Sequence, residues 1–393
     1  MDEVDSLMNE TVANNSTVAF TPDAGISSAA LFFMAIIPIY IGCHKSIKAV
    51  EESMKQESSE LTVLKPKEVA MFPVIASCTL FGIFLVFKVI AAEHINMLLS
   101  VYSFILGCQT VFTLSRPLSR LLPNSLSTTR FTLTLRQTHE GDDRDIEDFK
   151  FEFDKRDALP FLVAISTSIA YVTTKHWMAN NIIGISIAIT GIQYLHLDRV
   201  INGCILLGGL FVYDIFWVFG TGVMVFVATN FDAPVKVVFP RDFLTKGFLS
   251  KNVGMLGLGD IVIPGIFLAI LLRFDAKLNR NGSRLYFWTG YIAYIIGLLL
   301  TFIFMYTFRH AQPALLYLVP TCLGFPLAMA LVRGDFEQLM AYKDIPEEVE
   351  ARIKALKEEN VKKSAQLTHL GHMAKTRRFQ RNICRVSGKK AWT

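Results

Sequence analysis

Two aspartates interrupt long apolar stretches of this 393-residue chain. Asp214 lies in the run Phe211–Trp217, and Asp260 lies in the run Met255–Gly265. A charge at the depth of a membrane is unfavourable by about 3 kcal/mol on insertion scales, so such residues tend to be functional. If the two carboxylates face each other, mutual repulsion leaves them with one shared proton. One aspartate can then take a proton from water while the other donates one, which is the chemistry of amide hydrolysis.

The residues around the two aspartates predict an unusual local backbone. Gly257 and Gly259 precede Asp260, and glycine permits both a kink and the close approach of another backbone. Pro264 follows Asp260 by four residues and lacks the amide that would bond the Asp260 carbonyl in a helix. We expect that carbonyl to be released beside the carboxylate. Packing of small residues between helices is the alternative explanation of the glycines.

Two further segments are candidates for shaping the site. Pro313, Ala314 and Leu315 open the last apolar run, although a helix often begins near a proline. The stretch from Pro234 to Pro240 is a short β-like run between two prolines. It is either a simple linker or an edge strand that pairs with an unwound peptide substrate.

The composition predicts an all-α polytopic membrane protein. Hydrophobic residues make up 52% of the chain, which contains 31 phenylalanines and has a mean hydropathy of +0.40. Its apolar blocks are long enough to cross a hydrocarbon core of about 30 Å as helices. Nine spans are expected at about 26–43, 69–90, 95–115, 158–174, 180–196, 201–227, 253–272, 287–307 and 312–332. On this count Asp214 lies in the middle of the sixth span and Asp260 lies inside the seventh.

These spans divide the chain into four parts. They are an N-terminal tail (1–25), five spans with a long polar loop at 116–157 (26–196), four spans that contain both aspartates (197–335) and a C-terminal tail (336–393). The first tail has no lysine or arginine and carries sequons at Asn9, Asn14 and Asn15, so we expect it to be luminal and glycosylated. Most of the 39 lysine and arginine residues then fall on the cytosolic side, as the positive-inside rule requires.

Charge and cysteine usage exclude other classes of site. The net charge of +5 is modest, and its distribution reports membrane orientation, so no nucleic-acid partner is expected. None of the six cysteines forms a CxxC pair, which argues against a zinc site or a disulfide framework. The proposed acid–base chemistry needs no metal and no cofactor.

Taken together, the motifs resemble a known family. Tyr213-Asp214, Gly257-Leu258-Gly259-Asp260 and Pro313-Ala314-Leu315 are similar to the three signatures of the GxGD intramembrane aspartyl proteases, which include the presenilins. The longer runs 213–220 and 257–267 resemble the signal peptide peptidase branch.

The resemblance implies a presenilin-like helical fold in which Asp214 and Asp260 are catalytic. Tyr213, Gly257, Gly259 and Pro264 would shape the active site, together with the motif 313–315. It also implies an endoplasmic reticulum protein that cleaves signal-peptide remnants and type II membrane segments. Such a protein is expected to form homo-oligomers and to meet membrane-protein quality-control partners. Lys389 and Lys390 are displaced by one residue from the dilysine retrieval spacing.

Two other functions fit the intramembrane aspartates. A proton- or cation-coupled transporter would use Asp214 and Asp260 as ion sites, but this interpretation lacks a repeated half and leaves the paired motifs unexplained. A catalytically idle scaffold for membrane-protein quality control is the other alternative. Cleavage of a membrane peptide, and its dependence on each aspartate, distinguishes the protease from both.

Overall fold

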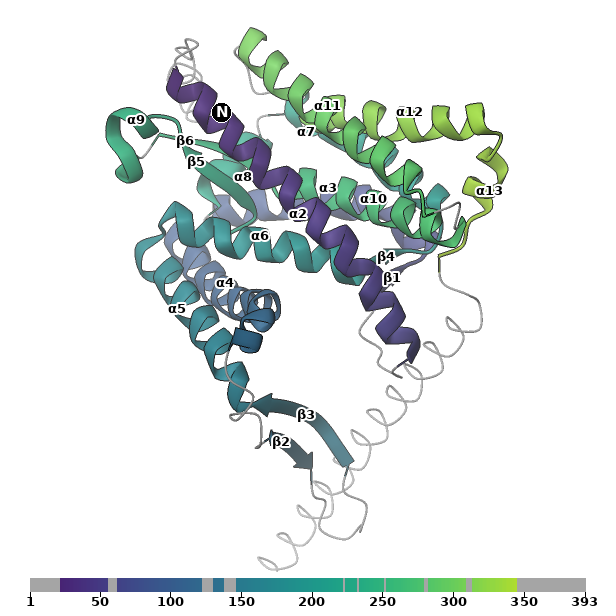
Figure 1. Cartoon of the computed structure of the whole chain (residues 1–393). Helices are drawn as coiled ribbons and strands as arrows, with labels where there is room; N and C mark the ends of the chain where they lie inside the picture. The colour runs from purple at the N-terminus through teal and green to yellow at the C-terminus, as the bar shows by residue number, and fades with distance from the viewer. Residues whose placement is uncertain are drawn as a thin grey trace, which may run out of the picture. The chain divides into compact units, whose positions relative to one another are not determined.

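The computed structural model describes residues 22–55, 62–121, 130–137, 146–221, 223–231, 233–250, 252–278, 282–308 and 313–344. Helices dominate these residues, and three short two-stranded sheets accompany them (Figure 1). The candidate glycosylation sites Asn9, Asn14 and Asn15 lie outside the described residues, as do Lys389 and Lys390.

Nine long helices of the described residues correspond to the nine predicted spans. They are α2 (Pro22–Lys55), α3 (Pro66–Val89), α4 (Ala92–Ser115), α5 (Ala158–Thr174), α6 (Trp177–Tyr194), α7 (Val200–Phe219), α10 (Gly259–Leu278), α11 (Leu285–Phe308) and α12 (Leu315–Arg333). Shorter helices are η1 (Arg116–Leu121), η3 (Lys155–Asp157), α8 (Val223–Asn230), α9 (Phe243–Lys246), η4 (Gly247–Leu249) and α13 (Phe336–Ala341). The chain is therefore a multi-pass membrane protein.

Seven of the nine long helices are apolar enough by composition to cross a membrane, and α6 and α10 are the exceptions. Each carries polar residues that lower its hydropathy or raise its charge. Helix α6 contains Asn180 and Asn181 near its start, and α10 contains Asp260 near its start and Arg273 near its end. Helix α10 carries Asp260, and α6 packs against it.

The predicted sixth and seventh spans were wrong in extent. Helix α7 ends at Phe219, and α8 is a separate short helix, so Asp214 lies in the last third of α7 and not in its middle. Residues Val253–Gly257 form strand β6, and α10 begins only at Gly259. Asp260 is thus the second residue of a helix. A short apolar run that contains glycines has no periodicity that separates a strand from a buried helix, which explains the error.

The segment 116–157, predicted as a polar loop, contains a β-hairpin. Strands β2 (Arg130–Gln137) and β3 (Ile146–Asp154) pair in antiparallel fashion, with an irregularity between Leu135 and Arg136. The signal was present in the sequence, because apolar and polar residues alternate in both strands. Of the acidic run 142–148, residues 142–145 lie outside the described residues.

Two other strand pairs stand at the ends of helices. Strand β1 (Thr62–Leu64) pairs in parallel with β4 (Leu195–Leu197), which joins α6 to α7. Strand β5 (Lys236–Pro240) pairs in antiparallel fashion with β6, and β6 leads directly into α10. The predicted β-like run at Pro234–Pro240 is confirmed as a strand.

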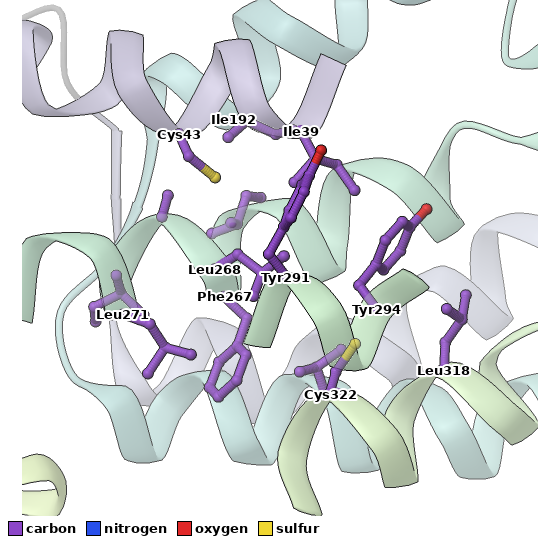
Figure 2. Packing of buried hydrophobic residues seen from close by; sticks show 14 of the residues in the cluster. Ile39, Cys43, Ile192, Phe267, Leu268, Leu271, Tyr291, Tyr294, Leu318 and Cys322 are labelled. Carbon is purple, nitrogen blue, oxygen red and sulfur yellow. The ribbon is translucent and has the colours of Figure 1, made fainter. Parts of the chain in front are cut away.

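Helix α10 forms the centre of the main hydrophobic core. Nearly all its side chains between Pro264 and Asp275 are buried, and it packs against α6, α7, α11 and α12. Figure 2 shows this packing, with Ile39 and Ile192 on one side of α10 and Leu318 and Cys322 on the other. Gly203 allows α7 to approach, because a Cβ there would lie 2.6 Å from Phe267. A single buried helix therefore connects the elements that carry the candidate residues.

Candidate active site

Asp214 is a buried carboxylate held by a backbone amide. It lies in α7 with a relative exposure of 5%. Its Oδ2 atom accepts a hydrogen bond of 3.1 Å from the backbone N–H of Leu315, 101 residues later in the chain. Leu315 is the first residue of α12, where a helix has N–H groups without partners inside the helix. A helix N-terminus also carries a partial positive charge that favours a carboxylate.

Asp260 is placed by the junction of β6 and α10. The β5–β6 ladder continues through a hydrogen bond of 2.9 Å from Leu258 N–H to the Val235 carbonyl. The Leu258 carbonyl then accepts from the amides of Ile261 and Val262, which starts the helix. Leu258 thus belongs to both elements, and Asp260 follows it in the first turn of α10. The register of the hairpin therefore fixes where the carboxylate lies.

The fold brings the two aspartates together. Helices α7 and α10 are in direct contact, and the carboxylates of Asp214 and Asp260 interact electrostatically. The motif at the start of α12 lies at the same site, because Leu315 bonds Asp214 and helix α12 is in contact with both α7 and α10. The three motifs, which are far apart in sequence, therefore meet in one place.

Pro264 leaves the Asp260 carbonyl without a helical partner, as the sequence predicts. The structure supplies a partner that the sequence reading missed. The hydroxyl of Tyr294, a fully buried residue of α11, donates to this carbonyl at 3.3 Å. Tyr291, one turn earlier on α11, donates to the Ile36 carbonyl at 3.2 Å. Both rings are visible in Figure 2.

The glycines before Asp260 have different surroundings. A Cβ on Gly257 would lie 3.4 Å from Oδ2 of Asp260, so the absence of a side chain leaves room beside the carboxylate. A Cβ on Gly259 would meet nothing within 4 Å, so no neighbouring part of the described protein requires glycine there. Tyr213 is partly buried against the core and lies near Trp217, with 6.4 Å between ring centroids. Its role in shaping the site stays a prediction.

The outer edge of strand β5 is occupied. Asn181 of α6 donates to the Val238 carbonyl at 2.6 Å and accepts from the Val238 N–H at 2.9 Å. Asn180 donates to the Lys236 carbonyl at 2.7 Å. Figure 1 shows α6 beside the β5–β6 hairpin. Of the two interpretations of the 234–240 segment, pairing of a substrate with its outer edge does not fit the structure, because side-chain amides already bond that edge.

The outer edge of strand β6 has a different character. In an antiparallel pair, alternate residues direct their N–H and C=O groups towards and away from the partner strand. The bonds Arg241 N–H to Asn252 and Leu258 N–H to Val235 set this alternation, so Val253, Met255 and Gly257 direct theirs away from β5. Met255 and Gly257 are exposed. In the described part of the chain, no other strand pairs with this edge.

Sequence reasoning missed Tyr294, Asn180 and Asn181 for different reasons. It considered ionisable residues in the spans, and tyrosine and asparagine are not among those that carry a charge near neutral pH. The paired asparagines were a usable signal, because amides inside a span form hydrogen bonds to neighbouring elements. Nothing in the sequence around Tyr294 distinguishes it from the other tyrosines of α11.

Comparisons with known proteins agree on one family. A family model described as signal peptide peptidase matches residues 55–346. The chain is 43% identical over 358 residues to the signal peptide peptidase of Mus musculus, covering 90% of this chain and 93% of that protein. It is 44% identical over 334 residues to the signal peptide peptidase of Homo sapiens, covering 84% and 87% of the two chains.

A solved structure is also similar. It is that of a presenilin family intramembrane aspartate protease, with a TM-score of 0.47 and 15% identity, covering 78% of this chain and 99% of that one. These comparisons give no support to a transporter. The family match and the identity to its members carry the conclusion: the chain belongs to the signal peptide peptidase family and is an intramembrane aspartyl protease.

Proposed function

We propose that Asp214 and Asp260 are the catalytic pair. The observation that carries this proposal is the meeting of α7, α10 and the start of α12 around two carboxylates that interact with each other. The ionised partner takes a proton from a bound water, and the water attacks a peptide carbonyl. The protonated partner stabilises the developing oxyanion and then donates its proton to the leaving nitrogen. Tyr213, Gly257, Gly259 and Pro264 shape this site with Pro313, Ala314 and Leu315.

The substrate must be unwound before it is cut. A peptide bond in a membrane helix has its carbonyl hydrogen-bonded and covered by side chains, and groups released by unwinding need new partners. We propose that the outer edge of β6 provides them, so that the substrate adds as a strand beside Met255 and Gly257. Because β6 ends at Gly257, three residues before Asp260, a peptide paired along it is led to the dyad.

The names of the relatives suggest the substrate class. We propose that the enzyme cleaves signal-peptide remnants and type II membrane segments in the endoplasmic reticulum. Segments with Gly, Ser, Pro or Asn should be cut most readily, because these residues weaken a helix. The tail 1–25 is luminal and glycosylated at one or more of Asn9, Asn14 and Asn15, and the C-terminus is cytosolic. We also propose that the enzyme forms a homo-oligomer and interacts with partners in membrane-protein quality control.

The test is cleavage by purified protein. Wild-type enzyme should cut a signal peptide with a destabilised helix, and transition-state mimics of aspartyl proteases should block the reaction. Asp214→Asn and Asp260→Asn keep the shape of each side chain but remove its acid–base function, so each should abolish cleavage while the thermal unfolding temperature changes little. Glu93→Gln, at an exposed position in α4, is the matched control and should retain full activity. Cleavage that survives either aspartate substitution would falsify the dyad.

A further inference from the structure

We propose that Asn181 is a positioning residue of the protease, which acts as a substitute for a third strand and fixes the register of the β5–β6 hairpin. The inference rests on the proposed function, in which the outer edge of β6 receives the substrate. It adds a residue from α6, a helix that carries neither aspartate. Asn181 acts through the hairpin and has no assigned contact with the reacting atoms.

The contacts of Asn181 imitate those of a neighbouring strand. Its amide donates to the carbonyl and accepts from the N–H of the same residue, Val238, at 2.6 and 2.9 Å. A residue of an antiparallel strand makes this pair of bonds with the residue opposite it. Asn181 is 5% exposed and Val238 is 8% exposed, so water has little access to replace either bond. The side chain therefore saturates the edge of β5 at its central residue.

The same face of α6 holds the hairpin at several other points. Asn180 bonds the Lys236 carbonyl, and the indole N–H of Trp177 bonds the Phe248 carbonyl at 3.2 Å. One turn after Asn181, Gly184 brings α6 close to the Pro234 carbonyl and the Leu258 side chain, at 3.6 and 3.7 Å from a built Cβ. Among these residues, Asn181 is the one that bonds both the N–H and the C=O group of a single strand residue.

The contact between Asn181 and Val238 is connected to Asp260 through the hairpin. Val238 is opposite Met255 in the ladder, and the ladder continues through Lys236 and Gly257 to the bond between Val235 and Leu258. The Leu258 carbonyl also accepts hydrogen bonds from the N–H groups of Ile261 and Val262 in the first turn of α10, so a shift of β5 moves the start of the helix that carries Asp260. A slip of one residue would also turn every side chain of a strand to the opposite face. Asn181 thus sets both where β6 lies and where Asp260 lies.

Asparagine is suited to this task because its amide offers a donor and an acceptor in one plane, as a peptide group does. Aspartate has the same size but, when ionised, it only accepts, so it can bond the Val238 N–H and not the carbonyl. Alanine leaves both groups without a partner in a place from which water is excluded. The two substitutions therefore separate the loss of the donor from the loss of the whole contact.

The experiment compares Asn181→Ala, Asn181→Asp and Asn180→Ala with wild type in the full-length protein. A synthetic signal peptide is cleaved, kcat and KM are measured, and the cut positions are read by mass spectrometry. We expect Asn181→Ala to lower kcat about tenfold or more, as the loss of two buried hydrogen bonds predicts. We also expect cuts to spread to neighbouring bonds. Asn180→Ala, which loses a bond at the strand end and a bond of 3.3 Å to Asn181 Oδ1 but leaves both Asn181 bonds to Val238, should have the smaller effect.

Ser186→Ala is the matched control on the same helix. Ser186 is buried, and its hydroxyl donates to the Ile182 carbonyl within α6. It should leave the cut positions unchanged. If Asn181→Ala does not fold, Asn181→Asp, which retains one of the two bonds, provides the same readout.

The proposal is overturned if the Asn181 variants that fold cut the same bonds with the wild-type kcat. It is also overturned if activity falls only in proportion to thermal stability while the cut positions stay fixed. Failure of the proposed function would give a different result. Asp214→Asn or Asp260→Asn would then still cleave the peptide, both with asparagine at position 181 and with its substitutes.

Discussion

The backbone N–H of Leu315 donates a hydrogen bond of 3.1 Å to the carboxylate of Asp214. This contact gives the Pro313-Ala314-Leu315 motif a physical meaning, because the first amide of α12 is directed at a buried carboxylate on α7. The donor belongs to the backbone. We therefore expect the motif to act through the position at which α12 starts.

Removing this amide should impair catalysis without changing any side chain. Replacement of Leu315 by leucic acid, its α-hydroxy analogue, exchanges the N–H for an ester oxygen. Because a hydrogen bond to a charged group contributes about 1.5–3 kcal/mol, we expect kcat to fall by about ten- to a hundredfold. The measurement is the rate of cleavage of a signal peptide. The same replacement at Leu316, whose amide bonds the Pro313 carbonyl at 3.2 Å, is the control and should have a smaller effect. Equal losses at both positions would contradict the role of the Asp214 contact.

The Tyr294 hydroxyl and Pro264 should be energetically coupled. Tyr294→Phe leaves the buried Asp260 carbonyl without its donor, which is unfavourable by about 1–3 kcal/mol. In a Pro264→Ala background the new amide at position 264 can bond that carbonyl, so Tyr294→Phe should be much less harmful there. The thermal unfolding temperature and kcat/KM of the four proteins test this as a double-mutant cycle.

Tyr291→Phe is the control for that cycle. Tyr291 lies one turn away on α11, but its hydroxyl bonds Ile36, so its substitution should be additive with Pro264→Ala. If Tyr294→Phe has the same effect in both backgrounds, the Tyr294 hydroxyl does not contribute through its bond to the Asp260 carbonyl.

Loss of Asp344 should destabilise the protein strongly. Both oxygens of its carboxylate lie 2.9 Å from Nε of Arg273, and the two side chains are 1% and 5% exposed. Asp344→Ala would leave a buried guanidinium without its carboxylate, at a cost of about 3–5 kcal/mol. Thermal unfolding in detergent measures this. Arg199→Ala removes an exposed partner of Asp198 and should cost less than about 1 kcal/mol. Similar unfolding temperatures for the two variants would refute the distinction.

His196, next to this pair, should make the protein sensitive to acid. It lies in β4, outside the long helices, and burial together with the charge of Arg273 lowers its pKa to about 3. In the unfolded chain the pKa is about 6.5, so only the unfolded state takes up a proton between these values. Stability is then fully present above pH 6.5 and falls by about 1.4 kcal/mol per pH unit as the pH decreases towards 3.

The pH dependence is measured as the unfolding temperature between pH 7 and pH 5. His196→Gln retains an amide that can donate to the Gln193 carbonyl, as Nε2 of the histidine does at 3.1 Å. This variant should lose less stability than wild type over the same range. Parallel curves for the two proteins would show that His196 does not titrate differently on unfolding.

Much of this protein could be predicted from the amino-acid types alone. Two aspartates in apolar runs, glycines before one of them and a proline after it indicated both the chemistry and the released carbonyl. Blocks of apolar residues predicted the nine long helices, because the length needed to cross a membrane is fixed by the bilayer. Local composition was sufficient for these features, since each depends on residues near one another in the chain.

Other features were decided only by the tertiary structure. Three hydrogen bonds join residues far apart in the chain: Leu315 to Asp214, Tyr294 to the Asp260 carbonyl and Asn181 to Val238. Their separations are 101, 34 and 57 residues, respectively. Such bonds depend on how helices are packed and on the register of a short hairpin, which a local pattern does not specify. The strand before Asp260 was not predicted for a related reason: the five residues of β6, two of them glycines, form a strand because β5 lies beside them. The sequence determined which residues could do chemistry, and the packing around α10 decided which of them meet.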